Sequence, residues 1–470
     1  MSGERGEKFS RELLQQPCYA FLGPANKRRM SDLQQQLADL RARVARINSK
    51  YDSKYDNGFT ASHAAEFSST FSTSDVGAES SAIPPERAQS AVEDWLGGEQ
   101  IETEYGRHFE TEKLYERYRR HGSADIGSLA DLPHDLLDAI SGGASPLAPP
   151  AEWAFLDTET TGLAGGSGTC AFLVGVGRIT AQGFRVRQFF MRDYCEEASL
   201  LDALTRHLAP FRVLITYNGR AFDQPLLETR YRLNRSRPPF GKLEHLDLLH
   251  GARRLWKLRY DSCRLVDLEN QVLGYEREGD VPGALIPYLY FEYLRTGRAA
   301  RLLPVFHHNA LDILSLACLT GIVPLAFKDP ENLPFKHGAE IAGIARWLRQ
   351  AGELEQARAL FRRSIDAGLP DDNLLFRTLW DLAALERKLG ADLQAIAVWE
   401  DLAAVRNPFR IPALEELAKH YEHRQKDPAR ALETTRAALA FEDTPSLRRR
   451  EERLVRRTAG RSTVKRRRLL

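Results

Sequence analysis

The chain has 470 residues and a formal net charge of +2, and 43% of its residues are hydrophobic. This length allows two or three domains of ~100–200 residues each, and the hydrophobic share is sufficient for sizeable cores. Five cysteines are scattered without a CxxC pair, which argues against a disulfide framework and a structural zinc site. Because no apolar run suggests a bilayer span, we expect a cytoplasmic protein without a membrane partner.

Residues 1–84 are predicted to form a flexible N-terminal extension. Within it, apolar side chains recur in alternating steps of four and three, which predicts a short amphipathic helix: Leu33, Leu37, Leu40, Val44 and Ile47. The Ser-, Thr- and Ala-rich segment 59–82 is typical of a linker. Residues 85–146 are highly charged, and we expect them to form a helical segment leading into the next domain.

Residues 147–328 are predicted to form an α/β domain. Four apolar segments separated by turn residues predict strands of one sheet: Ala154–Leu156, Ala171–Ile179, Phe184–Met191 and Val213–Thr216. Helices are expected at 197–209 and 222–233. Strands and helices mixed in this way indicate a mixed central sheet flanked by helices.

The remainder of the chain is predicted to be all-α. Three segments, at 352–361, 390–399 and 426–435, share a pattern in which Ala357, Ala395 and Ala431 occupy matching positions. The spacing is close to that of tetratricopeptide repeats, so residues 335–445 are expected to form helical repeats that bind a protein partner. An ordinary helical bundle is the alternative. Residues 446–470, rich in arginine and lysine, are expected to be a basic tail that either binds a polyanion or only solubilises the chain.

Two carboxylates stand at the end of the first predicted strand of the α/β domain, in the segment AFLDTETTGLAGGSGT. Asp157 and Glu159 are two positions apart, so their side chains leave a strand on the same face. Adjacent carboxylates repel each other unless a divalent cation neutralises them. Oxygen ligands without cysteine or histidine favour magnesium or manganese over zinc. This short pattern is also common in turns and at helix starts, so it does not decide the function alone.

Two later segments complete a recognisable constellation. LITYNGRAFDQPLL places Asn218 at a strand end and Asp223 at a helix start, and FHHNALDILSLACL places Asp312 on an amphipathic helix. In this order and spacing, the three segments resemble the exonuclease motifs of the DEDD superfamily within the ribonuclease H-like fold. Together with HLDLLHGARRLWK and SCRLVDLENQVLG, they resemble the YprB-type ribonuclease H-like family. The resemblance covers about residues 150–325.

This resemblance implies a metal-dependent 3′–5′ exonuclease that acts on DNA or RNA. Asp157 would bridge two divalent cations, Mg²⁺ or Mn²⁺, and Glu159 would help to hold one cation and the attacking water. Asp223 and Asp312 would complete the two ligand sets. Two cations held in this way activate a water and stabilise charge on the attacking and leaving oxygens of a phosphodiester.

Two histidines are candidates for the general base. His307 lies five residues before Asp312 and His308 four residues before it, and each position matches the base of one branch of the superfamily. If the segment is helical, His308 shares a face with Asp312, which slightly favours it. If His307 still belongs to a loop, it can swing into the site instead. An imidazole suits this role because its ordinary pKa is near ~6.5.

Several other residues are candidates for substrate contacts. Thr160, Thr161 and Gly162 would offer main-chain contacts to the terminal nucleotide, and Asn218 would touch the substrate or shape its own loop. Asp247 would line the site or cap a helix. A basic cluster either binds the phosphates of the nucleic-acid backbone or is a solvated helix face: Arg253, Arg254, Lys257 and Arg259.

The competing hypothesis is a non-catalytic scaffold that binds nucleic acid or protein through a relict nuclease fold and its repeats. The presence of all four acidic positions, Asp157, Glu159, Asp223 and Asp312, favours the enzyme.

Overall fold

The computed structural model describes residues 91–141, 147–162, 168–330, 332, 335 and 337–467, with side chains to residue 459. The predicted N-terminal helix and linker lie outside the described residues. The chain forms two compact units. In the smaller one, the described residues include the short helices η2 (Val92–Asp94) and η8 (Gly283–Leu285). The larger unit contains the sheet and the C-terminal helices, and it is described by itself below.

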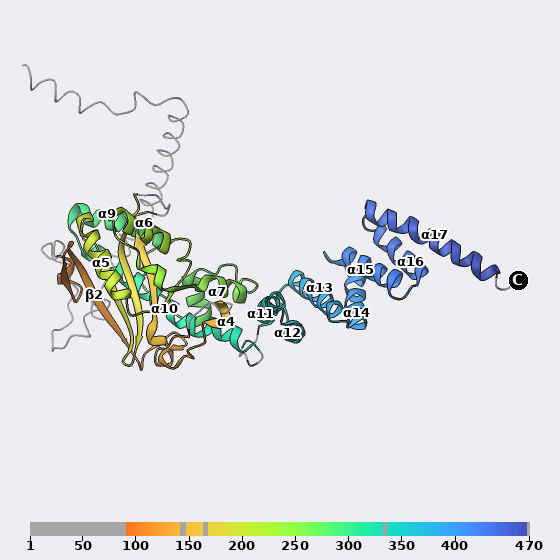
Figure 1. The fold of residues 1–470 in the computed structure, drawn as a ribbon, viewed down its shortest axis with the longest axis horizontal. Helices are drawn as coiled ribbons and strands as arrows, with labels where there is room; N and C mark the ends of the chain where they lie inside the picture. Colours follow the sequence, from red (N-terminus) through yellow and green to blue (C-terminus); the bar gives the residue numbers. More distant parts are fainter. Residues whose placement is uncertain are drawn as a thin grey trace, which may run out of the picture. The chain divides into compact units, whose positions relative to one another are not determined.

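The larger unit contains a seven-stranded sheet (Figure 1), in the order β1-β2-β7-β6-β5-β8-β9. Neighbours from β1 to β5 run antiparallel, whereas β8 pairs in parallel with β5 and with β9. The predicted mixed sheet is therefore confirmed. The strands are β1 (Gly98–Thr103), β2 (Gly106–Glu116), β5 (Trp153–Thr160), β6 (Ala171–Thr180), β7 (Gly183–Phe190), β8 (Val213–Thr216) and β9 (Glu244–Asp247). Two short strands, β3 (Arg120–His121) and β4 (Ala124–Asp125), pair separately.

The expectation of a helical lead-in at 85–146 is wrong for residues 98–116, which form β1 and β2. Charged side chains on these strands hid the strand pattern, because β1 is an exposed edge and charged residues are common on edges. On β2, the half-buried Glu112 is instead neutralised from the neighbouring strand, where Arg185 Nη1 lies 2.7 Å from its carboxylate. Charge at these positions is part of the sheet rather than a sign of a solvated helix.

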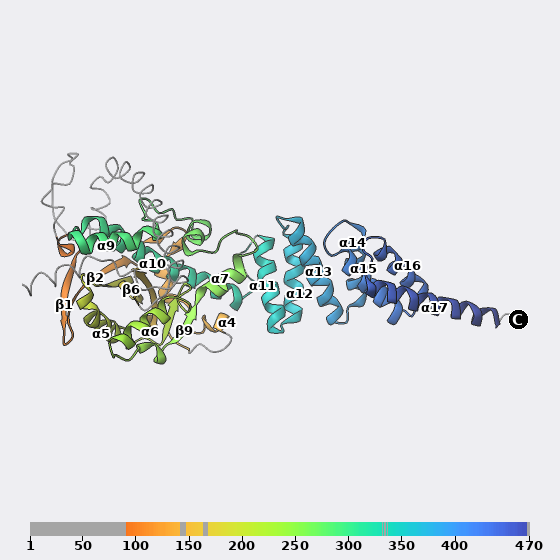
Figure 2. The ribbon, with the colours of Figure 1, turned by 90° about the horizontal axis from the view of Figure 1, so that it is seen from above.

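Helices cover both faces of the sheet (Figure 2). On one face, α10 (Leu303–Lys328) approaches β6 closely, because a Cβ at Gly175 would lie 2.2 Å from Asn309 Oδ1 and one at Gly177 would lie 2.5 Å from Ile313 Cγ2. On the opposite face lie α5 (Glu197–Leu208) and α6 (Asp223–Leu233), joined by the hydrogen bond from Tyr231 Oη to Leu201 O. Shorter elements complete the domain: η3 (Gly127–Asp131), α4 (Asp138–Ser141), η4 (Pro150–Glu152), η5 (Tyr194–Glu196), η6 (Pro239–Lys242), α7 (Leu248–Trp256), α8 (Leu265–Leu268), η7 (Glu269–Leu273), α9 (Ile286–Thr296) and η9 (Ala300–Leu302).

The helix α10 also corrects an expectation about membranes. The segment Ala300–Lys328 is long and apolar enough to cross a membrane by length and composition, although the sequence was expected to contain no such segment. In the structure, 78% of its most apolar window is buried. Its apolar character is explained by packing inside the sheet domain.

The C-terminal region is helical, as predicted. It consists of α11 (Gly338–Ala351), α12 (Leu354–Asp366), α13 (Asp372–Lys388), α14 (Asp392–Ala404), α15 (Arg410–His423), α16 (Pro428–Leu439) and α17 (Pro445–Arg467). The matching alanines Ala357, Ala395 and Ala431 are each fully buried, on α12, α14 and α16. The residue five positions before each alanine has a positive φ in the turn that precedes the helix, and these are Gly352 (95°), Gly390 (79°) and Lys426 (54°). The sequence pattern therefore corresponds to a repeated helix–turn–helix unit.

The basic segment at 446–470 is not a separate tail over the residues whose side chains are described. It continues as α17, whose Leu447 and Leu454 are 1% and 0% exposed. Arg450, Arg453 and Arg457 of this helix all contact the buried carboxylate of Glu422 on α15. This segment is part of the helical array.

The two turn glycines allow a test of the repeat geometry. An added Cβ at Gly352 or Gly390 would meet no described atom within 4 Å, so an alanine there would be strained only by its left-handed backbone. We expect Gly352→Ala and Gly390→Ala each to lower the free energy of unfolding by about 1 kcal/mol, measured by urea denaturation. Gly241→Ala is the matched control, because its site is equally open without a positive φ. Equal effects at all three positions would contradict this account.

Candidate functional site

Asp157 and Glu159 leave β5 on the face that α10 covers. Opposite Asp157 on β6 is Gly175, which leaves room for Asn309. Asn309 Nδ2 donates to Asp157 Oδ2 at 2.9 Å and lies 3.3 Å from the Asp157 carbonyl oxygen. This fully buried amide therefore fastens α10 to the strand end that carries the first two acids.

Asp223 begins α6, directly after the loop that follows β8. Its Oδ1 accepts a hydrogen bond from Thr158 Oγ1 at 2.5 Å, so the residue between the two β5 acids holds the third acid. Burial raises the pKa of Asp223 to about 6, although the hydrogen bond from Thr158 lowers it. This hydrogen bond joins the segment that carries Asp223 directly to β5.

Asp247 shapes the loop that precedes Asp223. It caps α7 through Leu249 N at 3.1 Å and also accepts from Asn218 N at 2.8 Å and Arg220 N at 3.2 Å. Asn218 has a φ of 68°, which asparagine tolerates better than most residues. Of the two sequence interpretations of Asp247, the structure shows the helix cap, with the added function of holding the Asn218 loop.

Asp312 lies on α10 and is held by a buried arginine that sequence reasoning missed. Arg277 Nη2 lies 2.5 Å from Asp312 Oδ1 and 2.6 Å from Glu269 Oε2, and Arg277 Nη1 lies 3.2 Å from Asp280 Oδ2. The Arg277 side chain is only 4% exposed. It lies in the charged segment EREGD, which by sequence resembles a solvated loop, so no local pattern distinguishes it.

The two histidines of α10 have different surroundings. His308 Nδ1 lies 2.8 Å from Asp280 Oδ1, and its Nε2 lies 3.6 Å from Asp312 Oδ2. Burial lowers the pKa of His308, but the hydrogen bond to Asp280 and the charges of Asp312 and Glu159 outweigh it and raise the pKa to about 9. Burial lowers the pKa of His307 to about 4, and Lys113 on β2 adds to that effect. His308 is therefore the histidine that the structure places beside Asp312.

The acids influence one another strongly. Burial raises the pKa of Asp157 well above its ordinary value, and the charges of Asp312, Glu159 and Asp223 raise it further. Burial also raises the pKa of Glu159 to about 8, opposed by His308 and reinforced by Asp312 and Asp223. Like-charge crowding of this kind favours bound cations, and carboxylate oxygens suit Mg²⁺ or Mn²⁺. Within the described part of the chain, however, no three His, Cys, Asp or Glu side chains are arranged ready to hold a metal ion.

The remaining candidates mostly make structural contacts. Thr160 Oγ1 donates to Gly162 O at 2.9 Å, and Thr161 N donates to Cys170 O at 2.9 Å, so this segment shapes the turn after β5. In the basic cluster, Arg259 Nη1 lies 2.7 Å from the buried Glu340 of α11, which makes it part of the packing between α7 and α11.

Comparisons with known proteins agree with this fold. Residues 154–323 match the family model of the RNase_H superfamily, so the sheet domain is a ribonuclease H-like domain. The chain is also 35% identical to the uncharacterized protein YprB of Bacillus subtilis (strain 168), over 288 residues that make up 61% of this chain and 68% of that protein. The chain therefore belongs to the same family as YprB.

The buried acids generate a prediction about stability. Because Glu159 has an ordinary pKa of 4.5 and a folded pKa of about 8, it binds a proton on folding between these values. Its stabilising contribution is full below the ordinary pKa and is lost as the pH rises through about 8. We expect Glu159→Gln, in EDTA, to raise the free energy of unfolding at about pH 9 by about 1 kcal/mol or more, measured by urea denaturation.

The matched control for this experiment is Glu278→Gln, which removes an exposed carboxylate and is expected to leave the pH profile unchanged. If Glu159→Gln and the wild type lose stability in parallel from about pH 5 to pH 9, Glu159 is not held in a crowded acidic site.

Proposed function

We propose that this protein is a metal-dependent nuclease, a 3′–5′ exonuclease that hydrolyses phosphodiester bonds of DNA or RNA. The observation that carries the proposal is the gathering of Asp157, Glu159, Asp223 and Asp312 in the ribonuclease H-like domain. The charges of the other three acids raise the pKa of Asp157, and those of Asp312 and Asp223 raise the pKa of Glu159. Burying mutually repelling carboxylates is costly unless it serves a site that neutralises them.

The four acids would hold two divalent cations, Mg²⁺ or Mn²⁺. Asp157 would be the main ligand, as the resemblance to DEDD nucleases implies, and its pKa responds to the charge of each of the other three acids. Asn309 keeps one oxygen of Asp157 in position from α10, and Thr158 does the same for Asp223. When bound, the cations would activate a water and stabilise charge on the phosphodiester oxygens.

His308 is the general base that we propose. Asp280 holds its Nδ1, so Nε2 faces Asp312 and is the atom that would accept a proton. Its raised pKa makes it an imidazolium at neutral pH in the metal-free protein. The charges of Asp312 and Glu159 are two causes of that rise, so the pKa falls once those carboxylates are neutralised. For His307, by contrast, burial and the charge of Lys113 lower the pKa to about 4.

Further roles complete the proposal. Thr160, Thr161 and Gly162 would contact the terminal nucleotide through the turn after β5, and Asn218 would do so from the loop that Asp247 holds. The helical array α11–α17 would act as tetratricopeptide-like repeats that bind a protein partner, supported by its repeated turns and buried alanines. We propose a cytoplasmic protein whose principal partner is nucleic acid.

The direct test is degradation of 5′-labelled single- and double-stranded DNA and RNA with Mg²⁺, Mn²⁺ or EDTA. We expect metal-dependent shortening from the 3′ end. Asp157→Asn should lose roughly a hundredfold or more of the rate, because metal-ion stabilisation of the transition state is worth several kcal/mol. Asp267→Asn serves as the control, since it removes a carboxylate that pairs with the exposed Arg264. Substrate binding without cleavage under every condition would instead support the scaffold hypothesis.

A second prediction separates the two histidines. We expect His308→Gln to lower kcat by about a hundredfold or more, as loss of a general base does. The fall of kcat at low pH, which reflects protonation of the base, should disappear in this variant. His307→Gln should keep both, because in this proposal the proton is accepted by His308 Nε2. The kcat values of both variants should be measured at saturating Mn²⁺. Melting temperatures equal to that of the wild type show that the variants are folded. A large loss in His307→Gln with normal rates in His308→Gln would reverse the assignment.

A further inference from the structure

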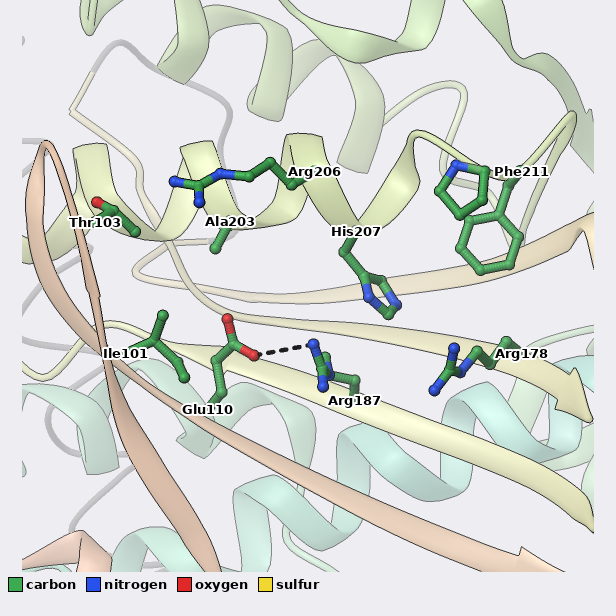
Figure 3. Close-up of a pocket in the computed structure, with 10 residues that line it drawn as sticks. Ile101, Thr103, Glu110, Arg178, Arg187, Ala203, Arg206, His207 and Phe211 are labelled. Carbon is green, nitrogen blue, oxygen red and sulfur yellow. Dashed lines mark ion pairs between the residues drawn. The ribbon is translucent and has the colours of Figure 1, made fainter.

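A second feature of the sheet domain is a cavity of about 380 Å³ between α5 and the sheet. Figure 3 shows α5 on one side of it and strand side chains on the other. Its lining is basic and partly apolar: Ile101, Thr103, Glu110, Arg178, Arg187, Ala203, Arg206, His207, Pro210 and Phe211. The volume is typical of a site for a small molecule.

This cavity lies on the opposite face of the sheet from the acidic site. On β7, Gln188 points to α10, where its Nε2 donates to Phe306 O at 2.8 Å. Arg187, the preceding residue, must point to the other face because side chains alternate along a strand. The same alternation on β6 separates Gly177, which faces α10, from Arg178, which lines the cavity. The cavity and the four acids are therefore distinct sites.

The strand arginines of the cavity are only loosely paired with carboxylates. Arg178 and Arg187 lie 3.4 Å and 3.3 Å from Glu112 Oε2, whereas Arg185 takes the other oxygen of that carboxylate at 2.7 Å. Charge-assisted bonds between nitrogen and carboxylate are usually ~2.7–2.9 Å long. The carboxylate of Glu110 is held by His108 at 2.9 Å and reaches Arg187 only at 3.4 Å. The arginines thus retain donors for a further anion.

Two buried nitrogens of the lining have no hydrogen-bond partner among the described atoms, Arg178 Nε and His207 Nε2. A buried donor or acceptor without a partner costs ~1–3 kcal/mol, so two such nitrogens in one lining point to a ligand that hydrogen-bonds to them. Burial, together with the charges of Arg187 and Arg178, lowers the pKa of His207 to about 4. The ring is therefore neutral, and the potential around it is positive.

The lining also contains apolar side chains, which come from both sides of the cavity (Figure 3). Ala203 lies on α5, Pro210 and Phe211 follow the end of that helix, and Ile101 lies on β1. A ligand that suits this lining has an anionic group and a flat or apolar body. With their ion-pair partners included, four arginines (Arg178, Arg185, Arg187 and Arg206) meet three carboxylates (Glu110, Glu112 and Asp202), so the lining keeps a net positive charge that suits an anion. A phosphate monoester carries about −1.5 to −2 at neutral pH.

We propose that this cavity binds a phosphate monoester of mononucleotide size, with the phosphate against Arg178 and Arg187 and the body against Phe211 and Ala203. The guanidinium fork matches phosphate oxygens in pairs, which a lysine would not do. His207 lies beside the arginines, where its neutral ring supplies a hydrogen bond to the ligand. The proposal stands independently of nuclease activity.

The test is isothermal titration calorimetry of the full chain with adenosine 5′-monophosphate, adenosine and inorganic phosphate. EDTA is present throughout, so that cations at the acidic site do not bind phosphate. We expect the monophosphate to bind, and adenosine and inorganic phosphate each to bind at least about tenfold more weakly, because each lacks one half of the ligand.

Variants locate the binding in the cavity. Arg178→Gln should weaken the binding of the monophosphate at least about tenfold, as loss of a hydrogen bond to a charged group does. Ala203→Leu keeps every charge but fills the cavity, and should weaken binding similarly. Arg206→Gln should weaken it less, because Arg206 is 62% exposed and pairs with Asp202 on its own helix. Arg232→Gln is the matched control, an arginine 68% exposed in the same kind of helical pair with Glu228.

Unchanged melting temperatures establish that the variants fold. If Arg178→Gln fails to fold, Ala203→Leu still tests whether the ligand binds in the cavity. Three results would overturn the proposal. They are no binding of the monophosphate up to millimolar concentration, inorganic phosphate binding as tightly as the monophosphate, and equal affinity in wild type, Arg178→Gln and Ala203→Leu. Binding of an oligonucleotide but not of the monophosphate would also overturn it, because the arginines would then contact the phosphates along a nucleic-acid chain.

Discussion

The close contact between α10 and the sheet is the constraint on which the site depends. Gly175 and Gly177 have no side chains to hold the helix away, so Asn309 reaches the end of β5 and hydrogen-bonds to Asp157. This contact brings Asp312, three residues further along α10, to the strand acids. A larger residue at Gly175 would clash with Asn309 and so displace the helix that carries one acid from the strand that carries two others.

Bringing acids together in a buried place requires compensation, and the chain supplies it behind the site. Arg277 contacts Asp312, Asp280 and Glu269, and Ser315 donates to the same Glu269. Removal of one member of such a buried network leaves the others uncompensated, which is far more costly than loss of a surface pair. Asp312 is therefore neutralised on one side by protein, while Asp157 and Glu159 keep raised pKa values.

The strands and helices from β5 to α6 could be predicted because their apolar runs are uninterrupted and their turns are rich in glycine. Asp157 and Glu159 could be paired from strand alternation alone. The network around Arg277 could not, because its members come from separate segments whose charges look solvated in the sequence. Nor could β1, an exposed edge strand with charged side chains, or β2, whose Glu112 is neutralised across the sheet by arginines of β7. Long-range ion pairs leave no local pattern, and this explains the omission of the Arg277 network and of β2.

The arginines of α17 show the same principle with a different outcome. Arg450, Arg453 and Arg457 are directed to the single carboxylate of Glu422, which is 0% exposed at its side chain. Much of the basic charge that the sequence displays here is consumed within the array. Because the strength and salt sensitivity of polyanion binding depend on how many counterions are displaced, α17 would displace fewer than its arginine content suggests. Among the residues of α17 whose side chains are described, Arg449 and Arg456 are exposed and remain available to an outside partner.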